Sequence, residues 1–431
     1  MNGSRRNARG EETLRSILQE TVKLVGKNGF DGTTINQITK ATGKPASSIY
    51  WLFSTKDELV AAALESTYQA DLTGLRLWPE FDPALSVEDQ LTPILSPSFI
   101  ARATEDPVRL GLMVALEGSS DGSAARVPFA TRRQKIRSGI SDWWQRAVQH
   151  QGNVLDPEVF GENMTALTIA LLDGHYMSDV EAPPGVLAQH QRGEYVAVAL
   201  GAAFRMLASN EGRLSIVDSS APKRELHSQP VAGEETPDLL NVVRTLVAEK
   251  GYNGATLARI CERSGMQRSS VYWRYKDKDH LISAAVSEPF LRLADMNLPK
   301  ESGVTPGLSS FAFCGATSIK LAMEDRSATV AGLLLKLQRR VPLVLASSTI
   351  MHGLELRLER MGTELQEHLA NDGEHEELTV DALRWLLHTL WEGLLLGVSF
   401  DYVYDVEGLT QVLSVMLEKV AGHAYREELP R

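Results

Sequence analysis

The feature that most constrains the fold is an internal repeat. The stretch SSIYWLFSTKDELV at residues 47–60 returns as SSVYWRYKDKDHLI at residues 269–282, with every position 222 residues further along the chain. Residues 29–62 and 251–284 align without a gap, and 13 of the 34 positions are identical. A match of this length at one fixed offset indicates a duplicated structural unit. The chain therefore contains the same small structural unit twice.

The length of 431 residues is enough for several hydrophobic cores, since one core rarely exceeds about 250 to 300 residues. The segment 209–236 between the two repeats is rich in Ser, Pro, Gly and charged residues, which predicts a linker. The chain thus divides into two halves of similar length. We predict a first repeat domain (1–66), a first helical body (67–208), a linker (209–234), a second repeat domain (235–288) and a second helical body (289–431).

Apolar residues recur at spacings of three and four in most segments, such as EETLRSILQETVKLVGKNG and TPDLLNVVRTLVAEKG, and strand signals are scarce. We therefore expect an all-α fold. Three helix breaks recur in each repeat: a glycine past the first helix, a capping threonine before the second, and a glycine in the turn before the third. They are Gly29, Thr34 and Gly43 in the first copy and Gly251, Thr256 and Gly265 in the second.

The third helix of each repeat has a small or polar face. At about 100° per residue, Ala46, Ser47 and Tyr50 share one arc, while Ile49 points toward the core. This pattern is typical of a helix-turn-helix, whose second helix enters the major groove of DNA. A Trp and a Lys follow, where an indole N–H and an ammonium group can reach phosphates. The residues that we expect to contact DNA are Thr34, Lys44, Ala46, Ser47, Ser48, Tyr50, Trp51 and Lys56 in the first copy, and Thr256, Gln267, Arg268, Ser269, Ser270, Tyr272, Trp273 and Lys278 in the second.

The charge distribution supports a local contact with nucleic acid. The whole chain has a net charge of -11, which is unfavourable for binding a polyanion over its entire surface. Residues 1–60 nevertheless contain nine Lys/Arg against six Asp/Glu, and residues 235–285 contain eight against six. Any contact with DNA is therefore expected to be confined to the two repeats.

Each repeat carries the pattern T-x3-I-x4-G-x6-Y-x2-F/Y-x2-K-x2-L and resembles the DNA-binding domain of the tetracycline-repressor (TetR) family. The resemblance covers about 50 residues per copy, and beyond them the chain resembles the family only in being helical. Tyr275 stands where the family more usually has Phe. The matching residues are Thr34, Ile38, Gly43, Tyr50, Phe53, Lys56 and Leu59 in the first copy and Thr256, Ile260, Gly265, Tyr272, Tyr275, Lys278 and Leu281 in the second.

The resemblance implies a dimer-like architecture, because family members pair through two C-terminal helices per subunit that form a four-helix bundle. We expect this chain to form that bundle within itself, as an intramolecular pseudo-dimer. Gly174 and Gly393 fall at similar points of the earlier helix of each pair and would permit close helix approach. The alternative is that the helices pack only within each half. The candidate bundle segments are 162–180 and 193–208 in the first half and 378–400 and 408–425 in the second.

The function predicted from these features is a sequence-specific transcriptional regulator, a repressor that a small-molecule effector releases from DNA. Its partners would be a double-stranded operator, asymmetric or pseudo-palindromic, and an effector that the sequence does not identify. The alternative is a helical enzyme or interaction scaffold with vestigial DNA-binding domains. The segment GSSDG at residues 118–122 fits G-x-S-x-G, but no strand precedes it. We therefore expect no enzyme and no catalytic role for Ser120.

Candidate effector-binding residues lie in both bodies; core packing is the alternative for Trp143, and an isolated helical histidine such as His175 is more often a surface or hydrogen-bonded core group. Cys261 and Cys314 belong to no CxxC pair, so we expect no structural metal, disulfide framework or cofactor. No signal peptide and no run of about 18 apolar residues is present, so we expect a soluble, cytoplasmic protein. The effector candidates are Phe129, Trp143 and His175 in the first body and Phe313 and Met323 in the second.

Overall fold

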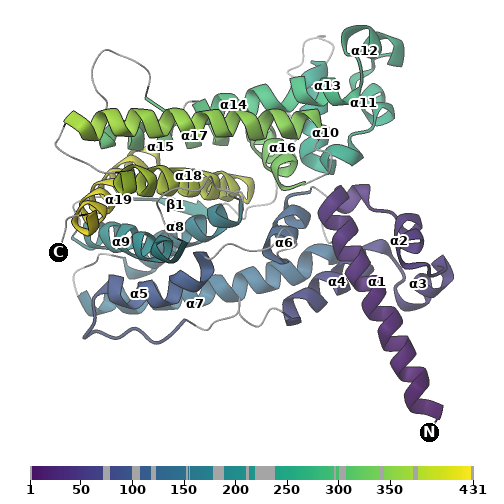
Figure 1. Ribbon diagram of the computed structural model, residues 1–431, viewed down its shortest axis with the longest axis horizontal. Helices are drawn as coiled ribbons and strands as arrows, with labels where there is room; N and C mark the ends of the chain where they lie inside the picture. Colours follow the sequence, from purple (N-terminus) through teal and green to yellow (C-terminus); the bar gives the residue numbers. More distant parts are fainter. Residues whose placement is uncertain are drawn as a thin grey trace.

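The computed structural model consists of two similar helical halves (Figure 1). The two repeat domains, which we call the heads, lie on the same side of the molecule, and the C-terminal helices of both bodies lie together on the other side. The expected all-α fold is confirmed. The residues that the structure describes are 2–70, 78–99, 107–117, 123–151, 154, 156–177, 189–209, 213–218, 238–295, 298–299, 307–338, 344–371 and 377–428.

The first half begins with a three-helix head, and the helix that follows connects this head to its body. The head helices are α1 (Asn2–Gly32), α2 (Ile35–Thr42) and α3 (Ala46–Leu52), and the connecting helix is α4 (Lys56–Ala70). The body comprises α5 (Val87–Leu95), a 3-10 turn (Ser96–Phe99), α6 (Pro107–Leu116), a 3-10 turn (Ala124–Arg126), α7 (Val127–Gln151), α8 (Pro157–Met177) and α9 (Gln189–Ala208).

The second half repeats the order of the α-helices but differs in its connecting helix. Its connecting helix is interrupted by a π-helical turn, whereas α4 is regular; such turns are insertions that change the register of a helix. The head helices are α10 (Leu239–Gly254), α11 (Leu257–Ser264) and α12 (Arg268–Arg274). The connecting helix and body comprise α13 (Lys278–Ile282), the π-helical turn (Ser283–Ser287), α14 (Glu288–Asp295), α15 (Leu308–Glu324), α16 (Arg326–Leu337), α17 (Leu345–Asn371), α18 (Glu377–Ser399) and α19 (Val406–Glu428).

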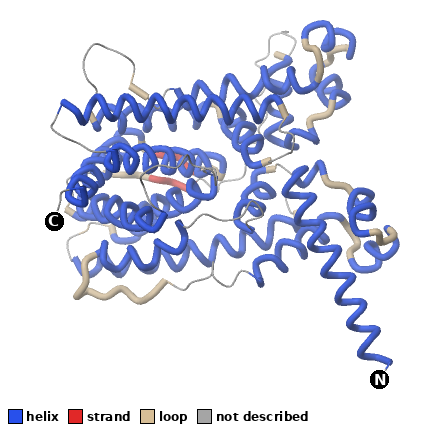
Figure 2. Tube along the Cα trace, in the orientation of Figure 1, coloured by secondary structure: helices blue, strands red, loops and turns tan. Residues whose placement is uncertain are grey.

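Two short strands, β1 (Ile216–Asp218) and β2 (Tyr402–Tyr404), pair antiparallel between the halves (Figure 2). The sequence predicted a linker over 209–234, and the structure places β1 within this segment. Asn163 of α8 holds this stretch, because its side chain donates to the Leu214 oxygen at 2.7 Å and accepts from the Ile216 N–H at 3.0 Å. The sequence did not predict β1, because a strand of three residues is too short to show alternating apolar and polar residues and because its partner is far away in the sequence. Residues 210–212 and 219–234 of the linker lie outside the described residues.

The two heads are built on the same four buried positions. Ile17, Ile38, Ile49 and Leu59 form the core of the first head, and the second head has Leu239, Ile260, Val271 and Leu281 at the matching places. The predicted helix breaks are confirmed. Thr34 and Gln37 form a capping box at the start of α2, Thr256 caps α11, and Gly43 and Gly265 adopt the left-handed conformation.

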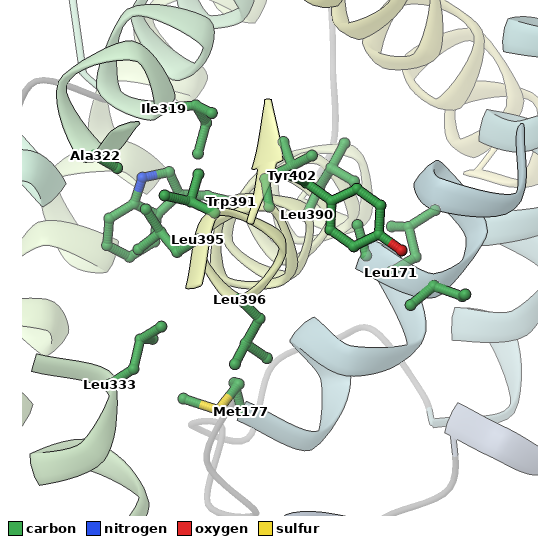
Figure 3. Packing of buried hydrophobic residues seen from close by; sticks show 14 of the residues in the cluster. Leu171, Met177, Ile319, Ala322, Leu333, Leu390, Trp391, Leu395, Leu396 and Tyr402 are labelled. Atoms are coloured by element: carbon green, nitrogen blue, oxygen red, sulfur yellow. The ribbon is translucent and has the colours of Figure 1, made fainter. Parts of the chain in front are cut away.

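The C-terminal helices of the two halves form the expected bundle, in which α8 packs against α18 and α9 against α19. Figure 3 shows part of the buried hydrophobic packing at this junction, to which Leu396 of α18 and Met177 of α8 both contribute. Helices packed only within each half are therefore excluded. Within the described ranges, no helix is both long and apolar enough to cross a membrane.

The closest approach in the bundle is at two glycines. A methyl group on Gly174 would overlap the main-chain oxygen of Thr389, and one on Gly393 would overlap that of Ala170. The backbone of each helix thus occupies the space that a side chain would take at the glycine of the other helix. Such a reciprocal contact is the kind that a two-fold axis produces. The expected close approach at these glycines is confirmed.

Replacing either glycine tests how much the bundle contributes. Gly174→Ala or Gly393→Ala should lower the free energy of unfolding by about 3 kcal/mol or more, because α8 and α18 must separate. Gly422→Ala on α19 is the matched control, since a methyl group there meets no atom within 4 Å and should stabilise the helix by about 0.5 to 1 kcal/mol. Urea unfolding measures both; equal effects at Gly393 and Gly422 would show that the crossing is not tight.

Candidate nucleic-acid interface

The recognition helices α3 and α12 present the same two aromatic residues to solvent. Trp51 is 85% exposed and Trp273 is 87% exposed, with Tyr50 and Tyr272 beside them at 55% and 44%. Large exposed aromatic side chains at equivalent positions are not explained by packing and mark a surface that contacts a partner. The other predicted DNA-contact residues on these helices, Ala46, Ser47, Gln267, Arg268, Ser269 and Ser270, are exposed as well, whereas Lys44 and Ser48 are half-buried.

The two recognition surfaces differ in charge. Arg268 is fully exposed, and its guanidinium lies 5.6 Å from the ring centre of Tyr272 with Nη2 3.4 Å from the tyrosine hydroxyl. The first head has Ala46 at this position. Arg274 at the end of α12 is also exposed, where the first head has the half-buried Leu52. The sequence analysis did not select Arg274, although its charge at the end of the recognition helix was a visible signal.

Lys56 and Lys278 do not project freely from the heads. Lys56 Nζ donates to the main-chain oxygen of Phe30 at 2.9 Å and lies 4.1 Å from the centre of the Phe30 ring. Lys278 makes the same pair of contacts with Tyr252, at 2.6 and 4.3 Å. Burial lowers the pKa of Lys56, although nearby Asp31 opposes this effect. Both lysines therefore fasten the start of the fourth helix to the end of the first, and a phosphate contact stays a prediction.

The lysine contact can be tested without DNA. Lys56→Met should lower the free energy of unfolding by about 1 to 3 kcal/mol, because the Phe30 carbonyl loses a charged donor while the aliphatic stem is kept. Lys40→Met, an exposed position on α2, is the control and should change little. If the two variants were equally stable and Lys56→Met instead reduced the salt dependence of DNA binding by about one unit, the ammonium would act mainly on phosphate.

The two heads also touch each other, which the sequence did not predict. Helix α1 packs against α10, and Asn253 Nδ2 donates to the main-chain oxygen of Asn28 at 2.9 Å. Across the same junction, Lys250 Nζ lies 3.7 Å from a carboxylate oxygen of Asp31. The separation of the recognition helices is therefore set by direct contact between the heads as well as by the bundle.

A buried pair lies where both heads meet both bodies. Glu117 follows α6 and Gln338 follows α16, and they are only 1% and 2% exposed. Gln338 Nε2 donates to Glu117 Oε1 at 2.8 Å, and the Asp31 N–H donates to Glu117 Oε2 at 3.1 Å. The pair fills the space next to Gly29 and Gly251, where positive φ angles of 76° and 63° kink the first helix of each head. Burial raises the pKa of Glu117 to about 7.

The effector candidates of the first body do not converge on one place. Phe129 is buried beside Gly111, and Trp143 is 1% exposed and packs edge-on against Trp78 at 5.7 Å. His175 is half-buried and lies 5.0 Å from the ring of Phe99. Their different neighbours favour core packing, and a role in effector binding remains a prediction.

In the second body, Phe313 is 59% exposed, so its side chain does not line a buried pocket in this structure. Met323 is half-buried, and its sulfur accepts a hydrogen bond from the Tyr404 N–H at 3.4 Å. This contact gives Met323 a role in holding β2 against α15. Ser120 and the rest of the GSSDG segment lie outside the described residues.

A buried polar network in the second body was also missed by the sequence analysis. Lys336 of α16 pairs with Glu392 of α18, whose Oε1 is 3.4 Å from His388 Nε2. His388 Nδ1 lies 3.3 Å from Arg357 Nη1 on α17. Burial lowers the pKa of both Lys336 and His388. The network ties three helices together, but among the described residues no group of three or more His, Cys, Asp or Glu is placed to hold a metal ion.

Two exposed recognition helices on a helix-turn-helix scaffold define a DNA-binding protein, and comparison with known proteins gives the same class. Residues 17–63 and 239–285 each match the family model of bacterial regulatory proteins of the tetR family, again 222 residues apart. The HTH-type transcriptional repressor AcnR of Corynebacterium jeikeium is 24% identical over 164 residues, which cover 38% of this chain and 80% of that protein. AcnR of Corynebacterium glutamicum is 34% identical over 59 residues, which cover 14% of this chain and 31% of that protein.

The chain therefore carries two DNA-binding domains of the tetR family in tandem and is similar to DNA-binding transcriptional repressors of that family. The duplicated heads and the bundle formed between the two halves make it an intramolecular pseudo-dimer.

Proposed function

We propose that one chain acts as a complete, sequence-specific repressor that binds a single operator with both heads. The observation that carries this proposal is the bundle of α8, α9, α18 and α19, which joins the halves of one chain where separate subunits would otherwise meet. A second contact made within the same molecule raises the overall affinity by about 10² to 10⁴ when the geometry fits. Fusion thus replaces dimerisation and removes its dependence on protein concentration.

We further propose that the two heads read different half-sites. Arg268 is exposed on α12, with Nη2 3.4 Å from the Tyr272 hydroxyl, and a guanidinium there would pair best with O6 and N7 of guanine. Ala46 in the first head can meet only a thymine methyl group or make no base contact. The operator would then consist of two unlike half-sites centred about 10 bp apart.

We also propose that a small molecule releases the repressor by changing the separation of the heads. The route available is through α6 and α16, which run within the bodies and end at Glu117 and Gln338 beside the kinked first helices of the heads. An effector can shift this equilibrium only if it binds more tightly to the arrangement that does not fit DNA. Its site would lie in one or both bodies.

The stoichiometry on DNA tests the central proposal. Light scattering of the protein on a short operator, obtained by selection from a random DNA library, should give one chain of 47.4 kDa per site. The bundle already uses the helix faces that would otherwise join two chains. A complex that forms on the shortest operator only with two chains would overturn the single-chain unit.

The difference between the heads gives a sharper expectation. Arg268→Ala should weaken binding by about 1 to 3 kcal/mol and relax the sequence preference in one half-site only, because the first head has no equivalent arginine. Arg146→Ala, at an exposed position on α7 in the first body, is a control of the same chemistry. Selection with both variants measures this. Recovery of a perfect palindrome with both halves equally affected by Arg268→Ala would show that the heads read the same bases.

A further inference from the structure

Glu117 and Gln338 are different residues at positions where the two subunits of a symmetric dimer would carry the same residue. Each follows the same element of its half, α6 or α16, and each lies beside the kink in the first helix of a head. On the two-fold axis of a homodimer, a residue meets its own copy. A fused chain is free of this restriction, and here a carboxyl group meets an amide.

The chemistry of the unlike pair explains its value at this position. An ionised carboxylate only accepts hydrogen bonds, whereas an amide NH2 donates them, so Glu117 and Gln338 are complementary. Two buried glutamates would repel each other unless they shared a proton. Because of the kink at Gly29, the main-chain N–H groups of Phe30 and Asp31 point at the carboxyl group of Glu117. The carboxylate therefore accepts hydrogen bonds from the first head and one more from Gln338.

We propose that Glu117 and Gln338 are positioning residues that lock the two heads at one separation, as an unlike pair that only a fused chain can carry. The pair, which we call the latch, connects the ends of α6 and α16 to each other and to α1. It adds to the direct head contacts between Asn253 and Asn28. The expected effect of the latch on operator binding rests on the proposed function, whereas its expected effect on the separation of the heads does not.

Glu117 and Gln338 can form a hydrogen bond with each other in either protonation state of Glu117. The ionised group accepts from Gln338 Nε2 and from the Asp31 N–H. When the group is protonated, its O–H can donate to Gln338 Oε1, a buried atom that has no hydrogen-bond partner in the structure. The charged groups that face the latch are Asp31 of α1, Lys56 and Asp57 of α4, Lys250 of α10 and Arg126, which donates to the main-chain oxygen of Glu117.

The pH dependence of exchanged variants therefore distinguishes a latch from simple packing. The wild-type pair and Glu117→Gln should hold the heads from pH 5 to pH 8, because an acid–amide or amide–amide pair always has a donor and an acceptor. Gln338→Glu places two carboxyl groups together, so it should hold the heads near pH 5, where they share a proton, and release them near pH 8. Combining Glu117→Gln with Gln338→Glu restores an unlike pair in the opposite order.

Spin labels report the head separation directly. Lys40 and Glu262 are exposed, equivalent positions on α2 and α11, and can be labelled through cysteines after Cys261 and Cys314 have been replaced by serine. We expect one narrow distance distribution for the wild-type pair, a broad one for Gln338→Glu at pH 8 that narrows at pH 5, and a narrow one at both pH values for the double exchange. We expect the unlabelled wild type and variants to rank in the same order by their affinity for DNA that was selected with the wild type. Gln338→Glu should lose about tenfold or more of this affinity at pH 8.

Several outcomes would overturn the latch. One is that Gln338→Glu gives the same distance distribution as the wild type at pH 8. Another is that the double exchange gives a distribution as broad as that of Gln338→Glu alone at pH 8. Circular dichroism and thermal melting of each variant separate loss of the latch from loss of fold. A wild-type chain that bound no selected DNA would refute the proposed function and leave the distance measurement as a valid test, whereas tight DNA binding by every variant would refute the latch alone.

Discussion

The rest of the structure depends on the close crossing of α8 and α18. Gly174 and Gly393 let each backbone occupy the space of a side chain on the other, so the halves meet along a reciprocal, two-fold-like contact. Because the bodies are joined in this way, the heads lie on the same side of the molecule and their first helices meet (Figure 1). A wider crossing would separate α8 from α18 and disturb every element that approaches the pseudo-axis, including Glu117 and Gln338.

The junction of heads and bodies carries the second constraint. Each head is joined to its body by its connecting helix and is also held by the end of a body helix beside its kinked first helix. The glycine kinks make this possible, since positive φ angles at Gly29 and Gly251 turn the chain at equivalent points and leave room for Glu117 and Gln338. A displacement of α6 or α16 would therefore change the surroundings of both kinks. The connection is asymmetric, because α4 is regular whereas its counterpart contains a π-helical turn.

The equivalent lysines show how a family pattern can hide a structural role. Lys56 and Lys278 belong to the pattern that identifies the DNA-binding domain, and a basic residue near a recognition helix suggests a phosphate contact. In the folded chain each ammonium group binds a main-chain oxygen of the first helix and covers an aromatic ring, while a phosphate contact stays a prediction. The charge is then used to close the head, and the exposed aromatic and arginine side chains of α3 and α12 become the clearest candidates for contact with DNA.

The sequence by itself determined the duplication, the helical class, the helix breaks of each head and the residues of the recognition helices, because these depend on local periodicity, capping and glycine conformation. It also placed Gly174 and Gly393 in the bundle, since they fall at similar points of the predicted bundle helices. Only the tertiary structure decided the partners of Lys56, the meeting of α1 with α10, the pairing of β1 with β2, and the contact between Glu117 and Gln338. These contacts join residues far apart in the chain, or end on main-chain atoms that every residue has, so no local pattern encodes them.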